Sequence, residues 1–142
     1  MKNTILSVCL LISQAIFAQS FDKPYALQVG AYNTYTKKWV WKPSEDIDLT
    51  ISIKSSTVRI NDEAMTTLIT FEDLGKGSGV DEDGDAYLTH KWKAYDERGR
   101  KCYFIMLFYK QLDLAIYTIA YTDYAFRYYM KRSDRIYENN NL

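Results

Sequence analysis

The sequence predicts an all-β domain: an antiparallel meander of about eight or nine strands that forms an up-and-down barrel or a strongly curved sheet. A two-sheet sandwich is the alternative. Segments in which apolar and polar side chains alternate follow one another along the chain, and short polar turns separate them. Residues 87–131 also hold 13 of the 22 aromatic residues. Because aromatic and β-branched residues favour strands, we expect strands along most of the chain.

The second half of the chain predicts four consecutive strands. Residues 101–109 are apolar at both alternating positions, so we expect both faces of this strand to be covered. The polar turn Asp96–Gly99 ends in a glycine, which suits a hairpin turn with a left-handed residue. Residues 112–121 also fit one face of a helix, but their Ile, Thr and Tyr content favours a strand. The four predicted strands are Tyr87–Asp96, Arg100–Tyr109, Leu112–Tyr121 and Tyr124–Lys131.

The first half predicts shorter strands of the same kind. The clearest alternation directs one set of aliphatic side chains into the core: Ile47, Leu49, Ile51 and Ile53. A second set shares one face of a later strand: Met65, Thr67, Ile69 and Phe71. Other strands are expected at residues 25–29, 37–42 and 57–60. Short strands joined by short turns predict an antiparallel meander.

The N-terminus has the pattern of a secretory signal peptide. Lys2 supplies the charged start, a short apolar run follows, and Ala18 is a small residue at the expected cleavage site. The apolar run is too short for a membrane anchor, and Cys9 lacks the small preceding residue of a lipoprotein signal. We therefore expect residues 1–18 to be removed and the protein to be exported, to a periplasmic or extracellular location. Residues 19–132 then form one domain, and residues 133–142 form a polar C-terminal tail.

Composition makes several partners unexpected. Eighteen basic residues balance 18 acidic ones, so the chain has no overall charge to attract nucleic acid or an anionic membrane. We expect no transmembrane segment in the mature chain. Removal of the leader leaves Cys102 as the one cysteine, which we expect to be buried as a small apolar residue.

Few residues suggest catalysis. The sequence lacks the common hydrolase, zinc and redox motifs. Its one histidine, His90, falls on the apolar face of a predicted strand, where we expect a hydrogen-bonded core residue. We therefore assign no catalytic residue and do not expect an enzyme.

One segment, residues 74–85, has distinctive chemistry. Three glycines are followed by acidic residues, among them Asp81, Asp83 and Asp85 at alternating positions. Alternating oxygen ligands resemble the start of an EF-hand calcium loop, so a calcium site is one interpretation. Ala86 stands where that loop requires glycine, and Trp92 where it requires glutamate. The other interpretation, which we prefer, is an acidic loop that caps a hairpin and holds no cofactor.

Two functions remain from different classes. The preferred one is a non-catalytic interaction module for another protein or a surface component, because tyrosine is favoured at interfaces. The tyrosines expected to point outward are Tyr87, Tyr95, Tyr117, Tyr121 and Tyr129. Trp39 and Trp41 share one strand face. They suggest either a stacking platform for a sugar or another flat ligand or, as we prefer, side chains that cover one end of the core. The alternative is a lipocalin-like carrier of a small apolar or aromatic ligand. A homodimer through the aromatic surface is a further expectation.

Overall fold

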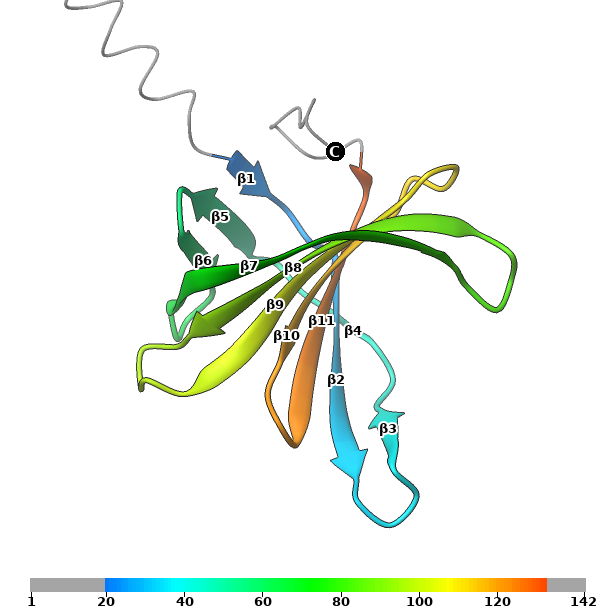
Figure 1. Ribbon diagram of the computed structural model, residues 1–142. Coiled ribbons are helices and arrows are strands. Elements are labelled where there is room, and N and C mark those ends of the chain that lie inside the picture. The colour runs from blue at the N-terminus through cyan, green and yellow to red at the C-terminus, as the bar shows by residue number, and fades with distance from the viewer. Residues whose placement is uncertain (1–19, 133–142) are drawn as a thin grey trace, which may run out of the picture.

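The computed structural model describes residues 20–132 of the chain, and all of its regular elements are β-strands (Figure 1). The predicted signal peptide and the predicted tail lie outside these residues. The strands are β1 (Ser20–Asp22), β2 (Ala26–Asn33), β3 (Lys38–Trp41), β4 (Glu45–Asp46), β5 (Thr50–Lys54), β6 (Thr57–Asn61), β7 (Thr66–Val80), β8 (Ala86–Tyr95), β9 (Lys101–Tyr109), β10 (Ala115–Ala120) and β11 (Tyr124–Met130).

The strands form one antiparallel sheet in the order β1-β5-β6-β7-β8-β9-β10-β11-β2-β3, with β4 also paired to β2. From β5 to β11 each strand pairs with its neighbour in sequence, as a meander requires. Residues 23–25 lead directly from β1, at one end of this order, to β2 near the other. The sheet must therefore curve strongly, and the predicted curved antiparallel meander is confirmed.

The sheet is not closed into a barrel, so the predicted barrel and the alternative sandwich are both wrong. The terminal strands β1 and β3 do not pair with each other. β3 has four residues and is followed closely by Pro43, which cannot donate a hydrogen bond to a further strand. Closure fails where the strands are short.

The core lies on the inner face of the curved sheet. Register places Phe104 of β9 opposite Ile119 of β10 and Trp92 of β8, so these side chains share that face. Leu68, Tyr117 and Met130 have no exposed surface. The predicted inward set around Ile51 also packs on this core, although Ile47 and Leu49 precede the strand itself. Cys102 is buried, as expected, and burial raises the pKa of its thiol to about 11.

The four predicted C-terminal strands are confirmed as β8 to β11, including the strand at residues 115–120. The hairpin turn is also confirmed. The Gly99 amide donates to the Asp96 carbonyl at 3.0 Å, and Gly99 has a φ of 74°. The expectation that both faces of β9 are covered is wrong, because Tyr103 is 39% exposed and Ile105 and Leu107 are half-buried.

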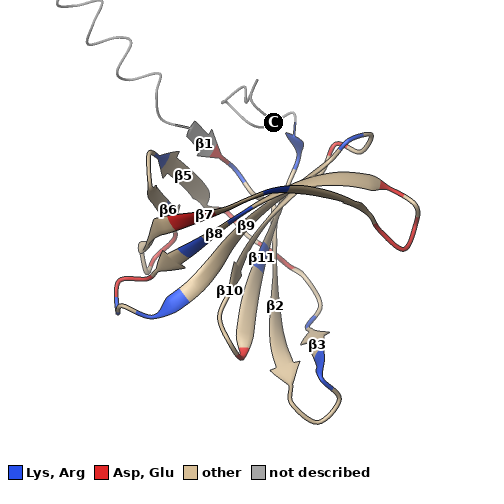
Figure 2. Cartoon of the chain, in the orientation of Figure 1, with Lys and Arg blue, Asp and Glu red and all other residues tan. Residues whose placement is uncertain are grey.

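The predicted loop at residues 74–85 is mostly strand. β7 continues to Val80 and leaves residues 81–85 as the turn into β8. This long hairpin projects as an arm from the sheet, and its tip carries acidic residues (Figures 1 and 2). The face of β7 that enters the core is that of Leu68, which is buried, whereas Ile69 and Phe71 are exposed. The alternation in this strand is real, but its apolar odd positions face outward.

Candidate functional site

The outer face of the sheet carries exposed large apolar side chains where β7, β8 and β9 lie side by side. We call Ile69, Phe71, Tyr95 and Tyr103 the outer aromatic patch. Ile69 pairs directly with Tyr95, and the Phe71 and Tyr95 rings stack with centroids 4.5 Å apart. Their exposures run from 36% for Tyr95 to 55% for Ile69. Apolar side chains gathered in this way on a folded protein are typical of an interaction surface.

A hollow of about 310 Å³ opens beside this patch. Phe71 and Tyr103 form aromatic walls, and Tyr121 and Thr122 line it from the β10–β11 turn. Lys93 and Lys101 supply positive charge at the same place. Such a hollow suits one anchoring side chain of a partner better than an enclosed ligand, since the pockets of ligand carriers bury most of the ligand.

Lysines lie beside the patch, and one of them contacts a patch ring. The Lys91 ammonium lies 4.1 Å from the centroid of the Tyr103 ring. Lys93 forms a 2.8 Å ion pair with Glu72, which raises the pKa of Lys93. The patch is therefore an apolar surface with a polar rim, as protein interfaces usually are.

The predicted outward tyrosines divide into two groups. Tyr87, Tyr95 and Tyr129 do lie on the outer face. The outward placement of Tyr117 and Tyr121 is wrong. Tyr117 pairs with Met106, whose side chain is buried in the core, and it has no exposed surface. The apolar residues at both alternating positions of β10 made its inward face ambiguous, and pairing with β9 decided it.

Tyr121 belongs to a polar network at the hairpin between β8 and β9. Its hydroxyl donates to Asp96 Oδ2 at 2.9 Å, and Arg100 Nε donates to the same oxygen at 2.7 Å. Asp96 Oδ1 accepts from the amides of Arg98 and Arg100. Burial opposes the charged form of Asp96, but these hydrogen bonds outweigh burial and lower its pKa. Burial and Asp96 together raise the pKa of Tyr121. The network fixes the hairpin next to the hollow.

Trp39 and Trp41 do share one face, as predicted, and their rings stack with centroids 5.8 Å apart. Trp41 covers Gly30, where a Cβ atom would lie 2.6 Å from the indole ring. The Arg127 guanidinium lies 3.5 Å from the Trp41 ring centroid. Trp41 is thus enclosed by its own chain, which leaves little ring surface for a ligand.

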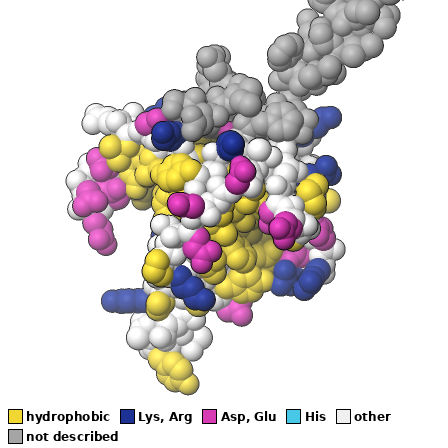
Figure 3. Space-filling model, turned by 180° about the vertical axis from the view of Figure 1, so that it is seen from behind, with side chains coloured by type: hydrophobic (Ala, Val, Ile, Leu, Met, Phe, Trp, Pro, Cys, Tyr) yellow, Lys and Arg dark blue, Asp and Glu magenta, His cyan; other side chains and the backbone are white. Residues whose placement is uncertain are grey.

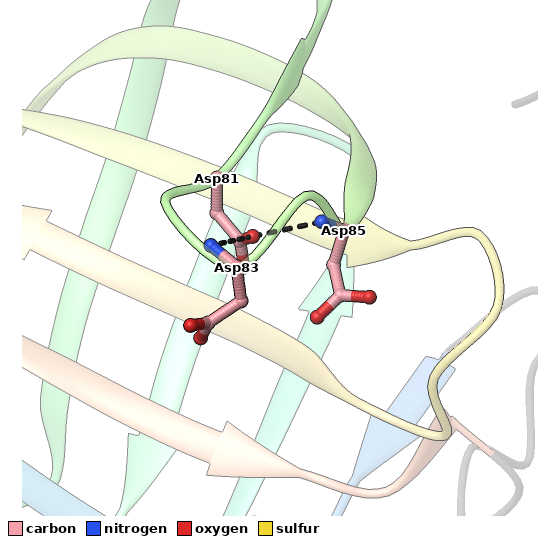
Figure 4. A group of neighbouring side chains, drawn as sticks. All are labelled: Asp81, Asp83 and Asp85. Carbon is pink, nitrogen blue, oxygen red and sulfur yellow. Dashed lines mark hydrogen bonds between the residues drawn. The ribbon is translucent and has the colours of Figure 1, made fainter.

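Asp81, Asp83 and Asp85 gather at the arm tip, with one carboxylate oxygen of each within 4.8 Å of the others (Figure 4). Asp81 Oδ1 accepts from the amides of Asp83 at 3.0 Å and Asp85 at 2.9 Å. The Asp85 amide is the main cause of the lowered pKa of Asp81. This oxygen closes the turn, which is the role of a hairpin cap.

His90 lies on the inner face, where its ring stacks on Trp92 with centroids 3.7 Å apart. Its Nε2 atom is 2.8 Å from Asp73 Oδ1. The Gly75 amide and His90 both lower the pKa of Asp73. This pair joins β8 to the irregular part of β7.

Sequence reasoning missed Ile69, Phe71 and Tyr103 as surface residues. Their alternating apolar pattern is the pattern of a core face, so it gave no signal of exposure. One signal was present: Leu68, on the opposite face of the strand, is also apolar. A strand with apolar residues on both faces must expose one face when nothing covers that side of the sheet.

No helix among residues 20–132 has the length and apolar character needed to cross a membrane. No protein-family model matches this sequence, and no curated protein or solved structure is significantly similar to it.

Proposed function

We propose that this protein is an exported, non-catalytic interaction module that binds another protein or a surface component through its outer aromatic patch. The observation that carries the proposal is the patch itself: four large apolar side chains on three adjacent strands, each at least 36% exposed, beside a hollow of about 310 Å³. Burial of such side chains in a partner is the main source of binding energy at interfaces.

The chemistry of the hollow indicates the kind of side chain that would enter it. Phe71 and Tyr103 offer ring faces, and Lys101 offers a cation at its edge. A partner residue with an aromatic ring, flanked by a carboxylate, would complement both features. The Asp96 network holds Tyr121 in place beneath this site, so little ordering is needed when a partner binds.

The lipocalin-like carrier is less well supported. A side chain that borders an unfilled cavity keeps accessible surface toward it. Tyr117, Leu68 and Met130 lie on the inner face of the curved sheet and have no accessible surface. Native mass spectrometry of the protein from the cells that export it gives a direct check, because a stoichiometric organic adduct of a few hundred daltons would favour the carrier.

Site-specific photocrosslinking tests the module. A photoreactive phenylalanine analogue replaces Tyr103 in the full chain, and the matched control replaces Tyr35, which is 95% exposed at the β2–β3 turn. We expect one discrete crosslinked species from position 103 and none from position 35.

A pair of double variants completes the test. Phe71→Ser with Tyr103→Ser removes the two patch residues that line the hollow, whereas Tyr35→Ser with Val40→Ser removes apolar groups elsewhere that are even more exposed. We expect the first pair to abolish partner capture with little change in melting temperature. Equal capture by both double variants would contradict the proposal.

A further inference from the structure

The arm contains a strand edge that pairs with no other strand of the described residues. β6 pairs with β7 only at Thr66–Ile69, and the Thr70 amide then donates to the Ser56 carbonyl. Beyond this point, up to Val80, the register of β7 includes only β8. One side of the strand is thus open over its second half.

The hydrogen-bond pattern shows which backbone groups face this open side. The Asp81 amide donates to the Asp85 carbonyl, and the Ala86 carbonyl accepts from Lys110 on the β9 side. Because bonded and non-bonded pairs alternate along an antiparallel ladder, Gly79 and Gly77 bond to β8. The N–H and C=O groups of Ser78 and Val80 therefore point away from the sheet.

Proteins usually protect such edges, and β7 is protected over only part of its length. Register shifts occur between Thr70 and Glu72 and between Asp73 and Lys76, and Gly75 has a φ of 92°. From Lys76 to Val80 the pairing is regular. β3, at one end of the strand order, is short and precedes Pro43, so it offers a poorer edge.

We infer that the edge of β7 around Ser78 and Val80 binds an extended, basic segment of a partner protein as an added strand. An added strand would supply hydrogen-bond partners for the outward N–H and C=O groups of these two residues. This surface is separate from the outer aromatic patch, because it is formed by backbone at the sheet edge.

Charge argues for a basic segment. Residues 72–85 contain six acidic side chains and one lysine. Glu72 and Asp73 face Lys93 and His90, whereas the other four acids gather at the tip, where Figures 2 and 3 show them projecting from the molecule.

Tyr87 supports the same chemistry beside the edge. Its hydroxyl and ring lie over Gly79, where a Cβ atom would be 2.5 Å from the Tyr87 oxygen. An added strand would place a side chain against this ring, and lysine or arginine interacts favourably with an aromatic face.

A second copy of this chain is a poorer occupant. Antiparallel pairing about Ser78 would bring Asp83 of one copy near Asp73 of the other. Like charges opposite each other destabilise a strand pair. The edge therefore suits a different chain of opposite charge.

The test selects binders from a displayed library of short random peptides, with the purified mature protein as target. We expect enrichment of sequences that combine lysine or arginine with β-branched residues. Ser78→Pro, which removes an outward N–H, should weaken an enriched peptide by about tenfold or more, and Ser78→Thr should leave it unchanged. Hydrogen exchange should slow at Ser78 and Val80 when the peptide is bound.

Controls keep each outcome decisive. Should Ser78→Pro fail to fold, the same peptide N-methylated at alternate amides tests strand addition on the unaltered protein. Tyr103→Ser must not affect peptide binding, which separates this site from the outer aromatic patch. The inference would be overturned if the binders contained no basic peptides. It would also be overturned if an enriched peptide bound Ser78→Pro as tightly as wild type and its N-methylated form bound wild type as tightly as the unmodified peptide. A wild-type dimer in sedimentation that Ser78→Pro converts to a monomer would overturn it as well.

Discussion

The Tyr117 hydroxyl donates a 2.6 Å hydrogen bond to Oδ2 of Asp22, a residue 95 positions away in the sequence. Both side chains are completely buried. Asp22 lies on β1 and Tyr117 on β10, strands that are not neighbours in the sheet. The bond therefore crosses the inside of the curved sheet and links its N-terminal edge to its far side.

Tyr117→Phe should destabilise the protein by about 1–3 kcal/mol, because it leaves a buried carboxylate oxygen without this donor. Urea unfolding of the protein measures the change. Tyr35→Phe is the control, since its exposed hydroxyl should matter by less than about 0.5 kcal/mol. Equal stability of the two variants would mean that the buried bond contributes little.

Asp96 should make stability depend on pH. Its pKa in the folded protein lies below its ordinary value of 3.8, which applies to the unfolded chain. Between these two values the unfolded chain binds more protons, so the contribution of Asp96 is complete above the unfolded pKa. It is lost as the pH falls through the folded pKa. Asp96→Asn should cost about 1–3 kcal/mol at neutral pH and flatten the acid limb of the stability curve. Urea unfolding as a function of pH, with the exposed Asp48→Asn as control, measures both effects; a wild-type acid limb in Asp96→Asn would contradict the prediction.

Gly30→Ala should displace the Trp41 ring. A methyl group there would lie 2.6 Å from the indole, while Arg127 stacks on the same ring. We expect a loss of about 1–3 kcal/mol from overpacking and a change in Trp41 fluorescence, measured with Trp39 and Trp92 replaced by phenylalanine. Ala31→Ser at the exposed neighbouring position is the control. An unchanged spectrum would show that the ring adjusts in place.

The acidic turn should keep its shape without calcium. Calcium takes about six to eight oxygen ligands, and one oxygen of Asp81 is already used by two backbone amides. We expect millimolar calcium to leave the melting temperature unchanged and native mass spectra to lack a stoichiometric calcium adduct. A calcium-dependent rise in melting temperature that Asp83→Asn removes would establish the site instead.

Local pattern was sufficient where one face of a strand is clearly polar or where a turn has its own chemistry. The Asp96–Gly99 hairpin followed from a polar turn with glycine at its left-handed position. Local pattern was insufficient for β7 and β10, in which apolar residues occupy both faces. In β10, Ile116 and Tyr117 are equally compatible with the core, and only the neighbouring strand determines which of them enters it.

The sequence by itself determined that this chain forms an antiparallel meander, because side-chain alternation and turn residues are local properties. It also determined which strands follow one another from β8 to β11. Only the tertiary structure decided that the sheet curves without closing, that Tyr117 reaches Asp22 inside it, and that Phe71 and Tyr103 stay outside. Those outcomes depend on strand length and register across the whole sheet, and a shift of one residue would exchange the two faces.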